Sequence, residues 1–334
     1  MEVEVENTFH APLPHAGEFI WGWEVPMYLF LGGLVAGLMI LSGYFYLRGR
    51  RDDYPFTVVG GAILAPVLLS LGMFMLFLDL EYKVHVWRFY TAFKVVSPMS
   101  WGSWILILIY PTSIVFIAAL LAEKGIGLGP LKPYGEKLRH RLKFLESAED
   151  YLKPVLSWAR GNIRFFAWSS IGLGIGLGAY TGILLSSYAA RPLWNSQALA
   201  PLFLISGLSS AAAFSVIAEK KDEAKHEMAK ADRVFIGAEL FFIFLIFANL
   251  AYSIRSHQWA LKPFVGSEIY TPMFWILVVG LGLIIPLILE LLEVRKVIKH
   301  TIAVPILVIL GGVFLRFAFV YAGQAVCWCY FILR

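Results

Sequence analysis

The sequence has few charged residues and only two cysteines. Of its 334 residues, 15% are charged and 59% are hydrophobic, whereas a soluble domain is about a quarter charged and about half apolar. This balance excludes an ordinary soluble globular protein. The cysteines, Cys327 and Cys329, form a single C-x-C pair, which cannot by itself complete a four-ligand zinc or iron–sulfur site. We therefore expect no metal in this chain.

Histidine is missing from the interior of every long apolar run. The seven histidines are His10, His15, His85, His140, His226, His257 and His300. A b-type haem in a membrane bundle needs two histidines that face each other at depth, so the sequence predicts no haem.

The acidic start also lacks the basic segment of a cleaved signal peptide. Nothing in the sequence indicates binding to nucleic acid.

What the sequence has in abundance is long apolar runs. About twenty apolar residues are enough to cross a bilayer as a helix, and eight runs qualify. They cover residues 25–47, 56–80, 102–122, 164–187, 199–218, 234–254, 272–293 and 302–326. We predict an all-α integral membrane protein with eight transmembrane helices in contact with membrane lipid.

The loops between these runs differ in charge. Four connections, at 48–55, 123–164, 219–233 and 294–301, hold 20 of the 28 lysines and arginines. Loops rich in these residues stay in the cytoplasm, so both termini and the segment 1–24 are predicted to be extracytoplasmic.

Nine of the eleven tryptophans fall on the outer side. Either they form a thick aromatic belt at that interface, or the outer face also docks a partner.

Short stretches recur at a spacing of roughly half the chain. "YLFLGGL" at 28–34 is similar to "PLFLISGL" at 201–208, and "SPMSW" at 97–101 to "TPMFW" at 271–275. Such repeats are typical of duplicated membrane units. We predict two four-helix bundles in parallel orientation: residues 25–187, with the cytoplasmic loop 123–164, and residues 188–334.

Glycines are concentrated in two of the predicted helices. "LGGLVAG" contains Gly33 and Gly37, and "GLGIGLGAYTG" covers residues 172–182. The second run is not preceded by a strand, as a nucleotide-binding loop would be. Both patterns instead predict close packing between helices.

Five ionisable residues lie within or at the ends of the apolar runs. A charge at the centre of a membrane helix costs about 2.5–3.5 kcal/mol, so such residues are candidates for function. Glu24 and Asp79 are near the outer boundary, Glu239 and Glu290 toward the inner side, and Arg316 past the midplane. Each has a structural alternative: Glu24 as a helix N-terminal carboxylate, Asp79 as a boundary anchor, Glu290 as an interfacial residue, and Glu239 with Arg316 as an ion pair.

Several motifs resemble one known family. "SPMSWGSW" at 97–104, "LAPLFLISGLSSAAA" at 199–213, "GAELF" at 237–241 and "LRFAFVYAGQ" at 315–324 are similar to motifs of the NrfD/PsrC family. That family comprises membrane subunits of nitrite, polysulfide and tetrathionate respiratory oxidoreductases. The resemblance implies a haem-free subunit in a prokaryotic inner (cytoplasmic) membrane, which exchanges electrons with menaquinone or another quinone near the outer surface. It also implies a multi-cluster, ferredoxin-like iron–sulfur partner on the outer face and, beyond it, a catalytic molybdopterin or multihaem cytochrome subunit.

The resemblance also assigns candidate site residues. Glu24 and Tyr28 match quinone contacts at the start of the first helix, where relatives have an amide and a histidine. Asp79 matches a carboxylate on a proposed proton route. His85, in "HVW", and Trp101, in "SPMSWGSW", occupy positions that follow it as in relatives. We expect Asp79 and Glu24 to be catalytic, and Tyr28, Glu24, His85 and Trp101 to bind the quinone.

The resemblance matches Glu239 and Arg316 to motif positions of the nitrite-reductase type, and we expect both, with Asp79, to transfer protons. A partly buried carboxylate can accept and release protons near neutral pH, so Asp79 is expected to exchange protons with a quinol. Two other classes of function stay open: an ion or small-molecule transporter, which should show broken helices at matching positions, and a purely structural membrane anchor.

Overall fold

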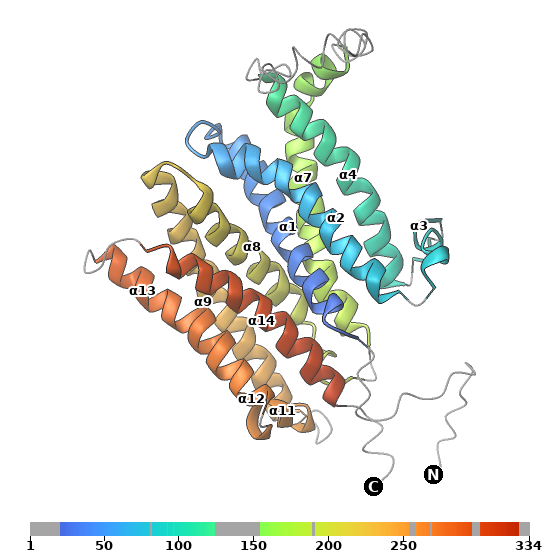
Figure 1. Ribbon diagram of the computed structural model, residues 1–334, viewed down its shortest axis with the longest axis vertical. Helices are drawn as coiled ribbons and strands as arrows, with labels where there is room; N and C mark the ends of the chain where they lie inside the picture. The colour runs from blue at the N-terminus through green and yellow to red at the C-terminus, as the bar shows by residue number, and fades with distance from the viewer. Residues whose placement is uncertain are drawn as a thin grey trace.

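The computed structural model describes residues 21–80, 82–91, 93–95, 97–123, 154–188, 191–253, 258–267, 269–295 and 301–326. These residues are nearly all helical, and none of them forms a β-strand. The long helices run side by side in one bundle (Figure 1). They are α1 (Glu24–Leu47), η1–α2 (Phe56–Gly60 and Gly61–Asp79), α4 (Pro98–Glu123), α7 (Ile163–Ser186), α8 (Leu199–Ala218), α9 (Asp222–Tyr252), α12–η4–α13 (Tyr270–Pro272, Met273–Ile284 and Ile285–Val294) and α14 (Ala303–Ala325).

Eight helices in the described part of the protein are long and apolar enough to cross a membrane, which confirms the predicted number. Most boundaries agree within four residues, but α9 begins at Asp222, twelve residues before the predicted start at 234. The first three turns of α9 are charged, so hydropathy marks only its apolar continuation. Acidic residues in its first turn, Asp222 and Glu223, favour a helix N-terminus there.

Helix α1 is the centre of the bundle. It is apolar on every side, as expected of a helix enclosed by others, and 89% of its most apolar stretch is buried. It packs against α2, α7, α8 and α14, and Figure 1 shows it in blue between them. In contrast, 28% of the corresponding stretch of α9 is buried, so α9 exposes most of its surface to the surroundings of the bundle.

Glycines allow α1 to approach α8 closely. A Cβ atom built on Gly37 would collide with the backbone oxygen of Gly207, and one on Gly207 would lie 2.7 Å from the backbone carbon of Gly33. In α7, a Cβ on Gly174 would lie 2.9 Å from the Ala36 oxygen, and one on Gly182 2.5 Å from the Ala200 Cα. The predicted role of these glycines in helix packing is confirmed.

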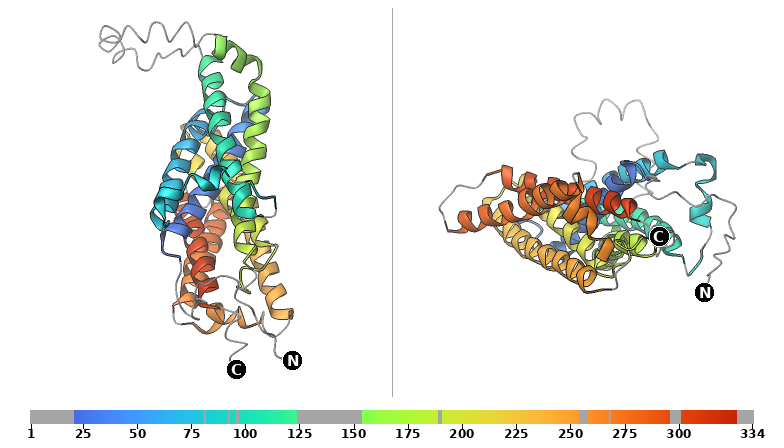
Figure 2. Two further views of the ribbon diagram at one scale, coloured as in Figure 1. Left: turned by 90° about the vertical axis from the view of Figure 1, so that its right-hand side faces the viewer. Right: turned by 90° about the horizontal axis from the view of Figure 1, so that it is seen from below.

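The helices before and after residue 190 lie on different sides of α1. Figure 1 shows α2, α4 and α7 on one side of α1, and α8, α9, α13 and α14 on the other. Viewed end-on in Figure 2, the orange and red helices lie opposite the cyan ones. The two sides meet where α1 and α7 pack against α8, and α1 against α14. The division into two duplicated bundles stays a prediction.

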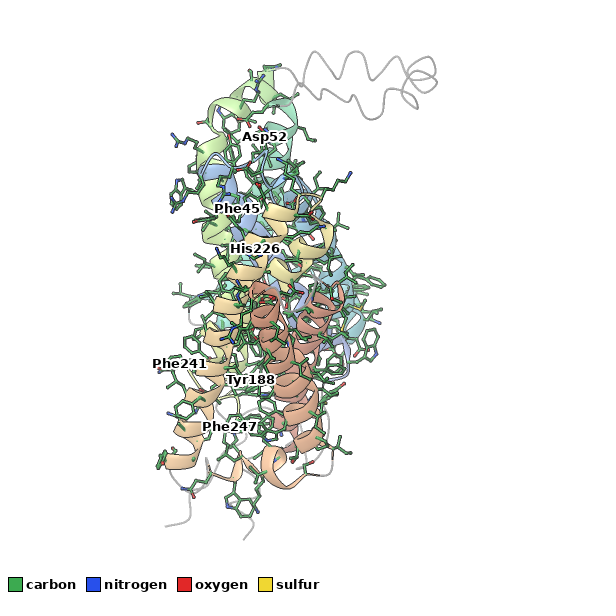
Figure 3. The ribbon with its side chains drawn as sticks, turned by 90° about the vertical axis from the view of Figure 1, so that its left-hand side faces the viewer. Phe45, Asp52, Tyr188, His226, Phe241 and Phe247 are labelled. Carbon is green, nitrogen blue, oxygen red and sulfur yellow. The ribbon has the colours of Figure 1, made fainter. Side chains whose placement is uncertain are left out.

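The two ends of the bundle differ in chemistry. Figure 3 shows Asp52 and His226 toward one end, and Tyr188 and Phe247 toward the other. At the first end, which carries the described basic connections, the Arg50 guanidinium lies 2.7 Å from the Glu227 carboxylate. At the second end, the short helices η2 (Lys83–His85), α3 (Arg88–Thr91) and α11 (Lys262–Gly266) connect the long ones. We call these the basic end and the aromatic end.

Some predictions fall outside the described residues. These are the pair Cys327 and Cys329, five of the histidines, and most of the loop 123–164.

Candidate functional site

A cavity of about 240 Å³ lies at the aromatic end, where α1 begins and α2 ends. Its wall is formed by the ends of α1, α2, α4 and α7, together with the segment that contains α3. Most of the lining side chains are apolar. The described polar side chains in the wall are Tyr28, Asp79, Tyr90, Ser103, Tyr180 and Tyr188. The cavity therefore suits an apolar molecule that presents a few polar atoms.

Asp79 and Tyr28, two of the site residues predicted from the sequence, both line this cavity. Asp79 is the last residue of α2 and is half-buried, and Tyr28 projects from the first turns of α1 and is 3% exposed. Among the described residues that line the cavity, Asp79 has the only carboxyl group. A proton released inside the cavity therefore has one strong acceptor in the wall.

Three tyrosines that the sequence did not single out complete the polar lining. Tyr180 lies against α4 where Gly102 leaves space, because a Cβ at Gly102 would collide with its ring. Burial raises the pKa of the Tyr188 phenol. Burial, and then the neighbouring Tyr110, raise the pKa of Tyr90. Tyr188 and Tyr90 thus stay protonated and able to donate hydrogen bonds across the neutral range.

The other predicted quinone ligands lie outside the cavity lining. Glu24 is half-buried at the start of α1, and its charge acts on Asp79. His85 is exposed on the short helix η2. Trp101 is 44% exposed, and its indole N–H donates to the Val95 oxygen at 2.7 Å. The segment between α2 and α4 lines the cavity through Val86 and Tyr90 instead.

The start of α1 is clamped to the end of α14. The Trp21 backbone N–H donates to Gln324 Oε1 at 2.8 Å, and Gln324 Nε2 donates to the Trp21 oxygen at 3.2 Å. The Trp21 ring, which lines the cavity, stacks on Trp194 at 5.0 Å between centroids. Trp194 in turn donates from its indole nitrogen to the Phe319 oxygen at 2.8 Å. The clamp fixes one wall of the cavity.

A second group of polar residues is buried inside the bundle around Arg316. Its side chain is fully buried. It donates to the Ser206 hydroxyl, to the Phe203 oxygen at 2.9 Å and to the Gly312 oxygen at 3.1 Å. The guanidinium also lies 5.0 Å from the centroid of the Phe203 ring.

Glu239 is the negative counterpart of this arginine. It is 3% exposed, it interacts electrostatically with Arg316, and the hydroxyls of Ser206 and Ser209 face its carboxylate. The Ser209 hydroxyl also donates to Asp232 Oδ1 at 2.6 Å. The arrangement links α8, α9 and α14 through polar groups within the apolar bundle.

The group continues toward the basic end. Glu290, interpreted from sequence as interfacial, is 3% exposed and faces Asp232, which is 1% exposed. Sequence reasoning did not select Asp232, Ser206 or Ser209. We call Arg316, Ser206, Glu239, Ser209, Asp232 and Glu290 the buried polar network.

No group of three or more His, Cys, Asp or Glu side chains in the described part of the protein could hold a metal ion.

Comparison with known proteins identifies a family. The family model described as "Polysulphide reductase, NrfD" matches residues 13–327. A polysulfide reductase chain of Wolinella succinogenes is 28% identical over 95% of this protein and 98% of its own length. Protein NrfD of Escherichia coli is 28% identical over 93% and 96%, respectively. A tetrathionate reductase subunit of Salmonella typhimurium is 23% identical over 64% of this protein and 53% of its own length. The chain belongs to the NrfD/polysulphide reductase family of multi-pass membrane proteins.

Proposed function

We propose that this chain is the haem-free, quinone-reactive membrane subunit of a respiratory oxidoreductase. It exchanges electrons between menaquinol or another quinol in the cavity at the aromatic end and an iron–sulfur partner subunit. The observation that carries the proposal is the mostly apolar cavity whose wall includes the Asp79 carboxyl group, the Tyr28 phenol and a few other hydroxyl groups. Relatives that match nearly the whole sequence include one named as part of a polysulfide reductase, which supports an oxidoreductase complex.

The cavity fits the head group of a quinol. Such a head is a flat, apolar ring with two oxygens at opposite edges, and the cavity offers aromatic walls, hydroxyl donors and one carboxyl group. Its volume of about 240 Å³ is slightly below that of sites for whole drug-sized ligands, which are about 300–1,000 Å³. The site therefore encloses the ring, while an isoprenoid tail extends into the bilayer.

Two side chains divide the work at the reacting oxygens. A bound quinol supplies two electrons and two protons when it is oxidised. Asp79 accepts the proton of one quinol hydroxyl and releases it toward the outer surface, where the second carboxylate, Glu24, lies close enough for its charge to act on Asp79. The proton of the other hydroxyl passes to water at the opening of the cavity. Tyr28 holds the ring oxygen by donating a hydrogen bond. His85 and Trp101 lie at the rim of the site and contribute to the shape of its opening.

The charge difference between the ends orients the protein. The connections that hold Arg48, Arg50 and Arg51 and the start of α9 lie at the basic end, which we assign to the cytoplasm. The cavity then opens near the outer face of an inner membrane. Trp23 and Trp87 are exposed there, at 49% and 55%, and with the described tryptophans nearby they form the surface on which a multi-cluster, ferredoxin-like partner docks. A molybdopterin or multihaem cytochrome subunit would bind beyond that partner.

We also assign Glu239 and Arg316 to proton transfer. A charged pair inside a membrane bundle is costly, and the pair is joined by hydroxyls to further carboxyl groups. Arginine keeps its charge at any physiological pH, so Arg316 acts as a fixed positive charge beside Glu239, which exchanges the proton.

The test is turnover and ligand binding in Asp79→Asn, with Asp52→Asn as the matched control at the basic end. The asparagine keeps the shape of the side chain and loses the base. We expect quinol-dependent turnover of the assembled complex to fall about 10²–10⁴-fold, with Asp52→Asn unchanged. A hydroxyquinoline quinol analogue should still quench fluorescence on binding, but with altered pH dependence. Unchanged turnover in Asp79→Asn would refute the role of this residue, and a folded wild-type subunit that binds no analogue would refute the site.

A further inference from the structure

We infer that Asp232 and Glu290 form a proton-binding carboxyl pair, loaded from a water-accessible pocket at the basic end, and that Ser209 passes its proton to Glu239. The inference names the source of the protons in the transfer route proposed above, and in that respect it rests on the proposed function. The presence of the proton itself does not depend on quinone chemistry.

The geometry of the pair requires a shared proton. Asp232 belongs to α9 and Glu290 to α13, and these helices pack against each other. The carboxyl groups face each other, and one oxygen of each, Asp232 Oδ2 and Glu290 Oε2, is buried without a hydrogen-bond partner. Two facing carboxylates in an apolar interior cannot both be ionised, and one proton between them satisfies both unpartnered oxygens.

The surrounding charges do not replace that proton. On α9, Glu239 adds a negative charge near Asp232. On α13, Glu293 adds another near Glu290. The one described cation that acts on Glu290 is Arg233, whose Nη1 donates at 3.4 Å to the Glu290 backbone oxygen and not to its carboxylate. Four carboxyl groups thus lie near two arginines, Arg233 beside Glu290 and Arg316 beside Glu239, and a bound proton reduces the excess of negative charge.

A pocket at the basic end reaches residues next to the pair in α9 and α13. It has a volume of about 620 Å³, and its lining includes Ala229 and Arg233 of α9, and Glu293 and Val294 of α13. Asp232 lies three residues after Ala229, and Glu290 lies three residues before Glu293. Each of the two residues is therefore within one helical turn, roughly 4.5 Å along the axis, of a residue in the pocket wall. Lysines and acidic residues make the rest of the wall polar, so water can bring protons to this depth.

Beyond the pair, the route continues through hydroxyl groups. Ser209 donates to Asp232 Oδ1 at 2.6 Å and also faces Glu239. The transfer begins when the shared proton moves to Asp232 Oδ1 and the Ser209 hydroxyl turns its hydrogen from Asp232 toward Glu239. Asp232 then gives its proton to the Ser209 oxygen as Ser209 gives its own hydrogen to Glu239, so one proton moves and the serine is regenerated. Ser206 then separates Glu239 from Arg316. The proton ends beside the fixed charge of the arginine, which favours its onward release.

Infrared spectroscopy of the full-length protein in detergent tests the pair directly. A protonated carboxyl group gives a C=O stretch that is distinct from that of a carboxylate and shifts in D₂O. We expect such a band at neutral pH, and we expect Asp232→Asn and Glu290→Gln each to remove or shift it. Asp52→Asn, which removes an exposed carboxylate outside the pocket lining, should leave it unchanged. A wild-type spectrum without a carboxylic acid band at neutral pH, or a band that neither variant changes, would overturn the inference.

Proton uptake in the assembled complex provides a second measurement. With the basic end facing a pH dye inside vesicles, uptake in Asp232→Asn or Glu290→Gln should slow by about 10²-fold, and binding of the quinol analogue should stay at the wild-type level. Uptake at the wild-type rate in both variants would overturn the route. If instead Asp79→Asn leaves turnover unchanged while the infrared band is present, the quinone proposal fails and the carboxyl pair stands.

Discussion

The charges of Arg316 and Glu239 should be energetically coupled, because each is buried and faces the other. Replacing Arg316 by methionine keeps an unbranched side chain but removes the cation and the donors to Ser206, Phe203 and Gly312. The two backbone oxygens lie within helices, so the main loss falls on the Glu239 carboxylate, which is left buried without a cation. Removing one partner of a buried pair costs about 3–5 kcal/mol, and we expect that loss for Arg316→Met.

The reverse change should cost less. Glu239→Gln keeps a polar side chain beside the two serine hydroxyls and leaves Arg316 with three oxygen acceptors, so we expect a loss of about 1–3 kcal/mol. In the double variant no charge remains to be compensated. Its cost should therefore be lower than the sum of the single costs by about 1–3 kcal/mol, in the range found for residues that interact directly.

The assay is unfolding of the full-length protein in mixed detergent micelles, followed by far-ultraviolet circular dichroism, for the wild type, both single variants and the double variant. Arg316→Lys serves as a control that retains the charge without the planar fork of donors, and its cost should fall between those of the wild type and Arg316→Met. Additive costs in the double variant would refute the coupling. The two charges would then act independently, and the proposal that Arg316 favours release of a proton from Glu239 would lose its basis.

Three further predictions test the packing and the cavity. Gly207→Ala should destabilise the protein by about 1–3 kcal/mol because its Cβ meets the backbone of α1. The control Gly172→Ala, whose Cβ meets nothing within 4 Å, should unfold at the wild-type midpoint temperature or above it. Equal midpoint temperatures for Gly207→Ala and the wild type would contradict this packing. Gln324→Leu removes two hydrogen bonds to Trp21 and should weaken binding of the quinol analogue roughly tenfold; unchanged affinity in a fluorescence titration would show that the clamp does not shape the cavity. Because burial raises the pKa of Tyr188, its phenol should keep its proton up to at least about pH 10, the ordinary tyrosine value. The affinity for the quinol analogue should therefore not fall as the pH is raised toward that value. A loss of affinity with a midpoint near pH 8 would be incompatible with a phenol donor.

The number of membrane helices could be predicted from the sequence because the requirement is one-dimensional. A segment that crosses the bilayer must satisfy its backbone internally and present apolar side chains over about twenty residues, and no knowledge of the partner helices is needed. The same reasoning misplaced the start of α9, since the part of a helix that extends beyond the bilayer into water does not need apolar side chains. Its first turns, "DEAKHEMAKADR", resemble any charged surface segment.

The candidate cavity could be predicted in part. Glu24 and Tyr28 are four residues apart and so lie on one face of a helix, and Asp79 ends the neighbouring span. Which of them reaches the cavity depends on where along α1 the cavity lies, and the structure places Tyr28 in the wall and Glu24 outside it. His85 lies on a short, irregular connection, whose course has no periodic pattern that would predict where its side chains point. Trp101 lies in the first turn of α4, with its indole bonded to the Val95 oxygen outside the cavity.

The buried polar network shows what a hydropathy pattern cannot resolve. Glu239 and Arg316 were identified because a charge within an apolar run is costly wherever it points. Asp232 lies in a run of charged residues and gave no such signal, although it is 1% exposed. Ser206 and Ser209 belong to "SGLSS", which is equally typical of close helix packing. Only the position of α8 against α9 and α14 distinguishes a packing serine from a hydrogen-bonding one.

Close packing and the placement of charge depend on the same small residues. A Cβ on Gly33 would lie 3.0 Å from Arg316 Nη2, so the glycine that lets α8 approach α1 also leaves room for the guanidinium against the central helix. Leu29, one turn before Gly33, is part of the cavity wall. Helix α1 therefore lies against the end of the buried polar network at Gly33 and lines the candidate cavity one turn earlier, at Leu29, so the same central helix contributes to both sites.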